Sequence, residues 1–285
     1  MTDAQRYYRV KRDLHTPDMA RLSLNQMTTE RWGVREAVEG CARAGIPYIG
    51  LWRHKVAELG VRASARVVRD AGLRVSSLCR GGMFVAASAA ARQTRLDDNC
   101  RAIDEAAELG AEVLVLVCGG MVDRDLDAAR AQVEESIAQL IPYAVERGVT
   151  LGIEPLHPAF AADRSVIVTL GQANDLVVRL NTTQVGVVID TYHVWWDPDL
   201  YAQIARAAGS ILGFHVDDWL CPNRDPLMGR GMMGDGVVDL RRIRAAVDKA
   251  GYRGPIEVEI FNQQIWDMPG HEVLRLMRER YLAYV

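Results

Sequence analysis

The feature that most constrains the fold is a regular alternation of short apolar runs and longer amphipathic segments. The apolar runs are bounded by glycine, proline or charged residues, which is typical of short buried strands. Eight strands are predicted, at residues 21–26, 46–52, 73–79, 111–120, 149–154, 185–190, 211–215 and 255–261. A helix is predicted after each of them, at 30–45, 55–72, 88–110, 126–148, 170–180, 198–208, 238–251 and 270–285.

Strands that alternate with helices favour a parallel sheet with right-handed crossovers. The number of repeats and the chain length predict an α/β fold with one catalytic domain, a single (β/α)8 TIM barrel over residues 21–285. The alternative is an open doubly wound sheet, but the glycine fingerprint expected behind its first strand is missing. Residues 1–20 are polar and charged. We predict that they form an N-terminal arm suited to packing on a partner subunit.

Composition narrows the possible partners and compartments. Lys and Arg number 34 against 37 Asp and Glu, which gives a net charge of −3 without a basic block and disfavours nucleic acid or an anionic membrane. Neither a signal-peptide core nor an apolar run of about 18 residues occurs, so no membrane span is predicted. The five cysteines contain no CxxC pair, which indicates reduced thiols in a cytoplasmic protein.

Four successive predicted strands end in a residue type that commonly binds metal ions: Glu154, Asp190, His215 and Glu259. In a parallel barrel, the C-terminal ends of the strands meet at one mouth. Each residue alone is readily explained as a helix cap or a loop salt bridge, whereas the four together are not. Three carboxylates and one imidazole suit Mn²⁺, Mg²⁺ or Co²⁺ better than structural zinc. We therefore predict one divalent metal ion per chain, with Mn²⁺ as the first choice.

Further residues near strand ends are candidates for contacts with a substrate. His157 and His193 each follow a predicted ligand by three residues, so they can reach over the mouth without binding the ion. Arg230 is expected to enter the site from a long loop, and Trp52 to form part of an apolar wall. A structural histidine, a surface arginine and plain core packing are the alternatives. The loop 229–234 matches GxGxxG, but it follows no strand directly, so dinucleotide binding is not predicted.

At these motifs the sequence resembles the xylose isomerase-like TIM barrels, the sugar phosphate isomerase and epimerase superfamily that includes tagatose 3-epimerase-type enzymes. The resemblance covers about residues 21–285 and is strongest in IEPLHP, VIDTYH, GFHVDDW, RGMMGDGVVDL and PIEVEIF. It implies one divalent metal ion bound by Glu154, Asp190, His215 and Glu259. It also implies that His193 and Arg230 contact the substrate.

Two positions depart from the pattern of the ketose epimerases. Phe160 stands six residues past the first ligand, where those enzymes carry a further glutamate, and Asp217 replaces a common lysine. The EPLHP and RGMMGDG phrases are also similar to the barrel subunit of C-glycoside deglycosidases, which cleave 3-oxo-glycosides together with a small β-rich partner. The alternative function is therefore a metal-dependent lyase, in which His157 would be the acid or base.

The expected reaction begins at a carbonyl and the adjacent hydroxyl of a sugar-like substrate, polarised by the metal ion. Glu154 or Glu259 would remove the carbon-bound proton next to the carbonyl and produce an enediolate. Return of the proton to the opposite face by the second glutamate gives epimerisation, and its return to the neighbouring carbon gives isomerisation. Loss of a leaving group, with His157 or His193 as the acid, gives elimination.

The sequence disfavours two other classes of protein on the same fold. A DNA-repair enzyme of the endonuclease IV type needs more histidines than the six present and a basic groove, which the net charge of −3 disfavours. A non-catalytic barrel that acts as a scaffold is disfavoured by the complete set of metal ligands. Barrels of this kind often pair, so we expect a homo-oligomer.

Overall fold

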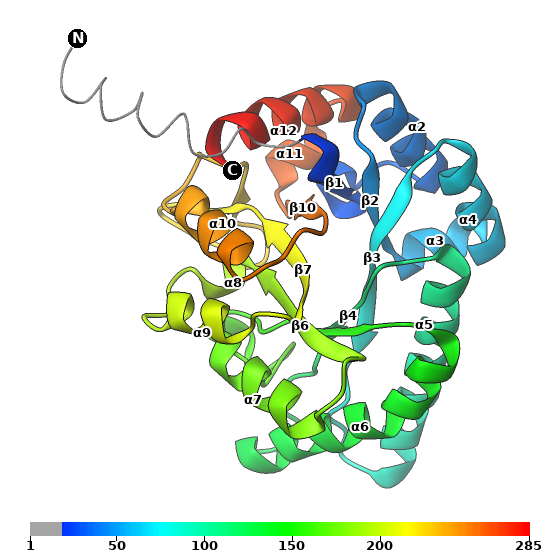
Figure 1. The fold of residues 1–285 in the computed structure, drawn as a ribbon, viewed down its shortest axis with the longest axis vertical. Coiled ribbons are helices and arrows are strands. Elements are labelled where there is room, and N and C mark those ends of the chain that lie inside the picture. Colours follow the sequence, from blue (N-terminus) through cyan, green and yellow to red (C-terminus); the bar gives the residue numbers. More distant parts are fainter. Residues whose placement is uncertain (1–18) are drawn as a thin grey trace.

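In the computed structural model, which describes residues 19–285, eight parallel strands close into a barrel surrounded by helices (Figure 1). The strands are β1 (Leu22–Asn25), β2 (Tyr48–Trp52), β3 (Arg74–Gly82), β4 (Leu114–Val117), β5 (Leu151–Ile153), β6 (Val185–Asp190), β7 (Ile211–Val216) and β10 (Ile256–Val258). The barrel closes because β1 pairs with both β2 and β10. The predicted (β/α)8 barrel is confirmed, and the open sheet is excluded.

The larger helices lie on the outside of the barrel: α2 (Val34–Ala44), α4 (Val61–Asp70), α5 (Ala89–Leu109), α6 (Leu126–Arg147), α7 (Leu170–Leu180), α9 (Leu200–Arg206), α10 (Leu240–Lys249) and α12 (Gly270–Tyr284). The last of them, α12, packs beside α2, so the ring of helices is closed as well (Figure 1). Shorter helices fill the connections: α3 (Arg53–Leu59), α8 (Thr191–Val194), α11 (Gln263–Asp267) and the 3-10 turns η1 (Met19–Arg21), η2 (Gln26–Thr29) and η3 (Pro158–Phe160). No helix in the described part of the chain is long and apolar enough to cross a membrane.

Glycines end several of these helices where the sequence predicts it. Gly45, Gly110 and Gly148 have φ angles of 67°, 64° and 66°, and their N–H groups bond back to carbonyls of the last helical turn. Glycine adopts this left-handed conformation without the strain that a side chain would add. A chain reversal follows each helix, and the next segment enters a barrel strand.

The predicted boundaries need several corrections. The helix expected at 55–72 is two helices, α3 and α4, because Gly60 at φ 90° interrupts the helical backbone between them. The third strand runs three residues further than predicted, to Gly82, whereas the fourth covers only Leu114–Val117. The predicted N-terminal arm, residues 1–20, lies outside the described residues except for Met19 and Ala20, which belong to η1.

The long loop predicted at 219–237 contains a small ribbon. Its strands are β8 (Asp218–Trp219) and β9 (Arg230–Gly231), which pair antiparallel with Trp219 opposite Arg230. The buried carboxylate of Asp218 accepts hydrogen bonds from the N–H groups of Gly234 and Val238, both at 2.9 Å. These bonds fix the return of the loop, so that Arg230 is buried at the mouth of the barrel instead of lying on the surface.

Candidate functional site

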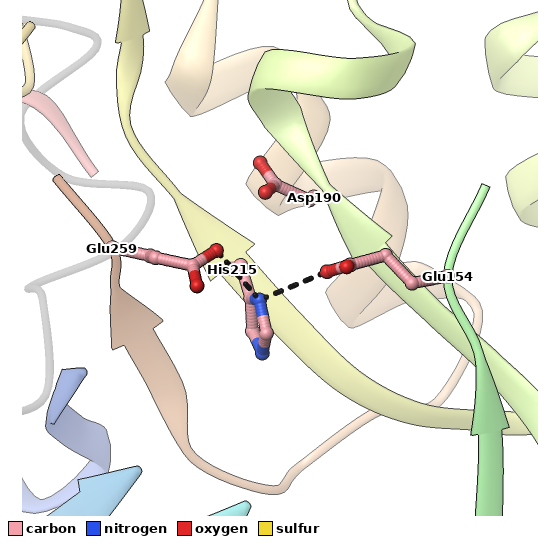
Figure 2. Close-up of side chains that lie close together, drawn as sticks. All are labelled: Glu154, Asp190, His215 and Glu259. Atoms are coloured by element: carbon pink, nitrogen blue, oxygen red, sulfur yellow. Dashed lines mark ion pairs between the residues drawn. The ribbon is translucent and has the colours of Figure 1, made fainter. Parts of the chain in front are cut away.

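The four predicted metal ligands meet at the C-terminal end of the barrel. Glu154 directly follows β5, Asp190 ends β6, His215 lies in β7 and Glu259 directly follows β10. All four are buried, and one ligand atom from each lies within 4.8 Å of the other three. Figure 2 shows their side chains directed toward one another from these separate elements.

The donor atoms of this cluster fit a divalent cation. His215 Nδ1 lies 3.2 Å from Glu154 Oε1 and 3.5 Å from Glu259 Oε2. Both Nδ1 and Glu154 Oε1 are buried, and neither makes a well-aligned hydrogen bond within residues 19–285. Buried polar atoms without a partner are costly. A metal ion would satisfy both atoms, and three carboxylates with one imidazole match the ligands that Mn²⁺ and similar ions take.

Charge points the same way, because negative groups outnumber positive ones around the cluster. Four carboxylates are buried there: Glu154, Asp190, Glu257 and Glu259. The positive groups that contact these carboxylates are the guanidinium of Arg230 and the imidazole of His215. Burial and the charge of Asp190 raise the pKa of Asp217 well above its usual range, although Arg230 opposes this rise. Four carboxylates in contact with two cationic groups favour the binding of a divalent cation.

In the absence of a metal ion, protons compensate part of this charge. Burial raises the pKa of Glu154 to about 7. His215 lowers this pKa, and the charge of Glu259 raises it by a smaller amount. Although burial opposes it, the carboxylates of Glu257 and Glu154 raise the pKa of His215 well above its usual range. Below about pH 7 the metal-free cluster therefore holds protons that a metal ion must displace.

We expect metal uptake to release about one proton or more per ion near pH 7. Because Glu154 is protonated below its pKa of about 7, the apparent affinity should rise by up to about tenfold per pH unit on approach to that value. Titration calorimetry with MnCl2 in buffers of different ionisation enthalpy measures the released protons. An affinity that is independent of pH below about pH 7 would contradict this interpretation.

Arg230 is bound to the ligand carboxylates themselves. Its Nη1 donates to Asp190 Oδ2 at 2.8 Å, to Glu259 Oε2 at 3.0 Å and to Asp217 Oδ2 at 2.6 Å. Although burial opposes it, the Arg230 charge holds the pKa of Asp190 well below its usual range. Arg230 thus keeps Asp190 ionised and fixes the orientation of both predicted ligands. Its predicted contact with a substrate stays a prediction.

The two predicted mouth histidines contact each other. The backbone N–H of His157 donates to His193 Nδ1 at 3.2 Å, and the His157 ring stacks on Trp219 with 4.8 Å between centroids. His193 lines the cavity beside the cluster, whereas the lining of this cavity does not include His157. Burial lowers the pKa of His193 to about 3, so its imidazole is neutral. His193 therefore lies beside the cluster, and His157 lies behind it, outside the cavity lining.

The neutral ring of His193 faces a second donor. Its Nε2 lies 3.1 Å from Arg230 Nη2. A neutral imidazole has one acceptor nitrogen, whereas Nδ1 and Nε2 each face an N–H donor, so only one of these two contacts is a full hydrogen bond. The guanidinium of Arg230 and the ring of His193 lie side by side in the cavity wall. Such a pair is suited to hydrogen-bonding oxygen atoms of a bound molecule.

Trp52 lies in the cavity wall, as the sequence predicts, together with Phe160 and Phe261. Its indole N–H donates to Asn25 Oδ1 at 2.9 Å, which fixes the ring. The free volume is about 50 Å³, less than the roughly 300 Å³ at the lower end of small-molecule pockets. Leu227, from the loop between β8 and β9, completes the wall. A sugar-sized molecule therefore requires part of this wall to move.

The predicted site omitted two buried carboxylates, Asp217 and Glu257. Glu257 Oε1 lies 3.8 Å from His215 Nε2, on the side of the ring away from Glu154. Asp217 accepts a hydrogen bond from Arg230 Nη1, as described above. Each lies two residues from a predicted ligand, Asp217 after His215 and Glu257 before Glu259. Because side chains two residues apart share a face of a strand, this spacing was a usable signal.

A network of buried polar side chains holds Glu257. Asn25 Nδ2 donates to its Oε1 at 2.6 Å, while the hydroxyls of Ser76 and Ser77 donate to its Oε2 at 2.6 and 2.9 Å. Gly50 leaves room for this carboxylate, since a Cβ there would lie 2.1 Å from Oε1. A fixed carboxylate behind a metal-binding histidine orients the ring and raises its basicity.

Glu257→Gln is expected to lower the affinity for Mn²⁺ by about tenfold while the protein stays folded. The amide keeps the volume of the side chain but removes the charge behind His215. Metal titration and circular dichroism of the variant measure the two effects. Glu108→Gln, which changes an exposed glutamate on α5, is the matched control. An unchanged affinity would show that Glu257 is structural only.

Comparison with known proteins gives similarity to a family, to enzymes and to a solved structure. The family model described as xylose isomerase-like TIM barrel matches residues 38–280. An L-ribulose 3-epimerase of Methylomonas sp. strain DH-1 is 25% identical over 248 residues, 82% of this chain and 81% of that protein. A 3-dehydroshikimate dehydratase of Pseudomonas aeruginosa is 33% identical over 186 residues, 60% of this chain but 27% of the dehydratase. A crystal structure of a Sinorhizobium meliloti 1021 protein is 50% identical, with a TM-score of 0.91 over 94% of this chain and 99% of that one.

Proposed function

The chain belongs to the xylose isomerase-like TIM barrel family, and from this premise we propose that it is a divalent-metal-dependent isomerase or epimerase of a sugar or keto-sugar. The observation that carries the proposal is the buried cluster of four ligand-type residues within 4.8 Å of one another. The relationship to an L-ribulose 3-epimerase over four-fifths of both chains supports a ketose-like substrate.

In this proposal the metal ion is held by Glu154, Asp190, His215 and Glu259. Mn²⁺ is our first choice ahead of Mg²⁺ or Co²⁺. Mg²⁺ typically takes only oxygen ligands, whereas Mn²⁺ accepts one imidazole beside three carboxylates. When bound, the cation supplies Lewis-acid polarisation of the substrate carbonyl, which acidifies the neighbouring C–H. Glu257 orients His215 from behind, and Arg230 orients Asp190 and Glu259.

Glu154 and Glu259 are the proposed proton carriers. Both line the cavity, and Figure 2 shows them reaching His215 from two sides. One carboxylate removes the proton from the carbon next to the carbonyl, and the other returns a proton to the opposite face, which gives epimerisation. Return to the neighbouring carbon gives isomerisation. Arg230 Nη2–H and the adjacent His193 ring would hold substrate oxygens, and Trp52 would cover an apolar face of the sugar.

The first test is the metal content of untreated protein. We expect elemental analysis to find about one Mn, Co, Mg or similar ion per chain, and the exposed-residue variant Glu108→Gln to retain it. Protein that has lost its metal to a chelator should stop exchanging the substrate's carbon-bound proton with D2O, and added MnCl2 should restore the exchange. Wild-type protein that contains no metal and takes up none would remove the basis of the proposed function.

A second candidate is a metal-dependent lyase acting by elimination, such as the C-glycoside deglycosidase subunit. Phe160 favours it, because this residue occupies the position of the further glutamate of ketose epimerases, lines the cavity and packs edge-on against His193 at 5.7 Å. Similarity to a 3-dehydroshikimate dehydratase also supports elimination. His193, whose imidazole is neutral, would then orient the leaving group, and His157, stacked on Trp219, would need to move to protonate it. NMR spectra of the products distinguish an epimer from an unsaturated ketone.

A further inference from the structure

Two arginines outside the proposed machinery line the same cavity as Glu154 and Glu259. Arg80 lies in β3, and Arg164 follows η3. The N–H of Gly119, just after β4, donates to the Arg164 carbonyl at 2.8 Å and so fixes its backbone beside the barrel mouth. Neither side chain has a role in the scheme above.

Arg80 has no counter-ion of its own. Its Nη1 is buried and donates to no hydrogen-bond acceptor within residues 19–285, and no carboxylate there forms an ion pair with it. The other arginines with largely buried side chains all have such pairs: Arg21 and Arg244 with Asp248, Arg53 with Asp98 and Glu105, and Arg230 with Asp190. A buried guanidinium without a partner is costly, so its persistence in a cavity wall requires a reason.

Arg164 reinforces this unbalanced positive charge. Its nearest carboxylate is that of the adjacent Asp163, 3.9 Å away, and its guanidinium lies over the Phe160 ring at 5.7 Å. Burial and then the charge of Arg164 lower the pKa of Arg80. The negative charge of Glu154 raises the pKa of Arg80 and so stabilises its charged form. A cation bound in the metal centre would neutralise that same negative charge. Two guanidiniums therefore lie at one cavity, one with an unpartnered Nη1 and the other with a single long ion pair.

We propose that Arg80 and Arg164 bind an anionic group of the substrate, a carboxylate or a phosphate, while the metal centre acts on its carbonyl end. This inference rests on the proposed function and narrows its substrate class to acidic sugars, sugar phosphates or related keto-acids. The planar guanidinium presents paired N–H donors that match both oxyanions. A neutral ketose would leave Arg80 Nη1 without a partner.

Paired probes test this inference on the metal-loaded protein. The pairs are D-gluconate against sorbitol and D-ribulose 5-phosphate against D-ribulose, with binding followed by calorimetry. We expect the anionic member of at least one pair to bind about tenfold more tightly, and the pair that shows the difference identifies carboxylate or phosphate. Arg80→Gln and Arg164→Gln should each weaken the anionic probe by about tenfold and leave the neutral probe unchanged. Arg35→Gln, on the exposed face of α2, should change neither.

The metal content of each sample separates this inference from the proposed function. Metal-loaded protein that shows no preference for either anionic probe overturns the anion site but leaves the proposed function in place. Equal loss of the neutral and anionic members in both arginine variants also overturns it. Protein that takes up no metal overturns the proposed function, whichever probe binds. Arg164 is about one-third exposed, so Arg164→Gln decides the question should Arg80→Gln fail to fold.

Discussion

Glu259→Gln is expected to reduce turnover by about a thousandfold or more, even at saturating metal. The amide cannot accept a proton, and loss of a general base commonly lowers the rate by about 10² to 10⁴-fold. Both carboxylate oxygens of Glu259 also accept hydrogen bonds, from Arg230 Nη1 at 3.0 Å and Asn25 Nδ2 at 3.2 Å. In glutamine an NH2 group replaces one of the two oxygens and cannot accept a hydrogen bond from these donors. The side chain would therefore rotate away from the substrate.

The measurement is the exchange of the substrate's carbon-bound proton with D2O, followed by NMR on a keto-sugar that the wild-type protein turns over. Metal occupancy has to be determined in the same samples, because Glu259 is both a proposed ligand and a proposed base. Glu108→Gln controls for the loss of one carboxylate. Near-normal exchange by a metal-loaded Glu259→Gln variant would exclude the proposed proton transfer.

Glu154→Gln is expected to weaken metal binding by about a hundredfold or more. A neutral amide oxygen replaces an ionised ligand, and affinity for hard divalent cations follows the number of charged ligands. The variant should nevertheless fold well. Burial raises the pKa of Glu154 to about 7, above its unfolded value, so its ionisation destabilises the metal-free protein as the pH rises toward 7. Glutamine avoids that cost.

Two measurements on Glu154→Gln therefore move in opposite directions. In chelator-treated protein at about pH 7 and above, the midpoint of thermal unfolding should be higher in the variant than in the wild type. With excess MnCl2 the order should reverse, because the wild type binds Mn²⁺ more tightly and so gains more stability from binding. A variant that binds Mn²⁺ as tightly as the wild type would mean that Glu154 is not a ligand.

Arg230 shows how one residue can serve both stability and chemistry. Its Nη1 contacts Asp190, Glu259 and Asp217, while its Nη2 lies beside His193 Nε2. The first set of contacts holds the pKa of Asp190 well below its usual range and orients two of the predicted metal ligands. The second places Arg230 Nη2 beside His193 in the cavity wall, where we propose that they contact the substrate. Without Arg230 the cluster would carry one more uncompensated negative charge, so substitutions there test structure and function together.

The sequence alone determined the fold and the positions of the four ligand-type residues. Apolar runs of strand length, helices ended by Gly45, Gly110 and Gly148, and a polar residue at the end of each later strand are local patterns. Because parallel strands of a closed barrel all point their C-terminal ends to one mouth, the positions of Glu154 and Glu259 followed from the fold class alone. A side chain reaches only a short distance from its strand end, so these residues had to lie close to one another.

Only the tertiary structure decided how the residues at this mouth are paired. Arg230 meets Asp190 across 40 residues of sequence, and Asn25 meets Glu257 across 232. Such contacts depend on the register between strands and on the fold of the loop between β8 and β9, which no local pattern specifies. For the same reason the unpaired state of Arg80 could not be seen in the sequence. Whether a charge has a partner depends on the whole surrounding shell, whereas a strand or a helix depends mainly on its own residues.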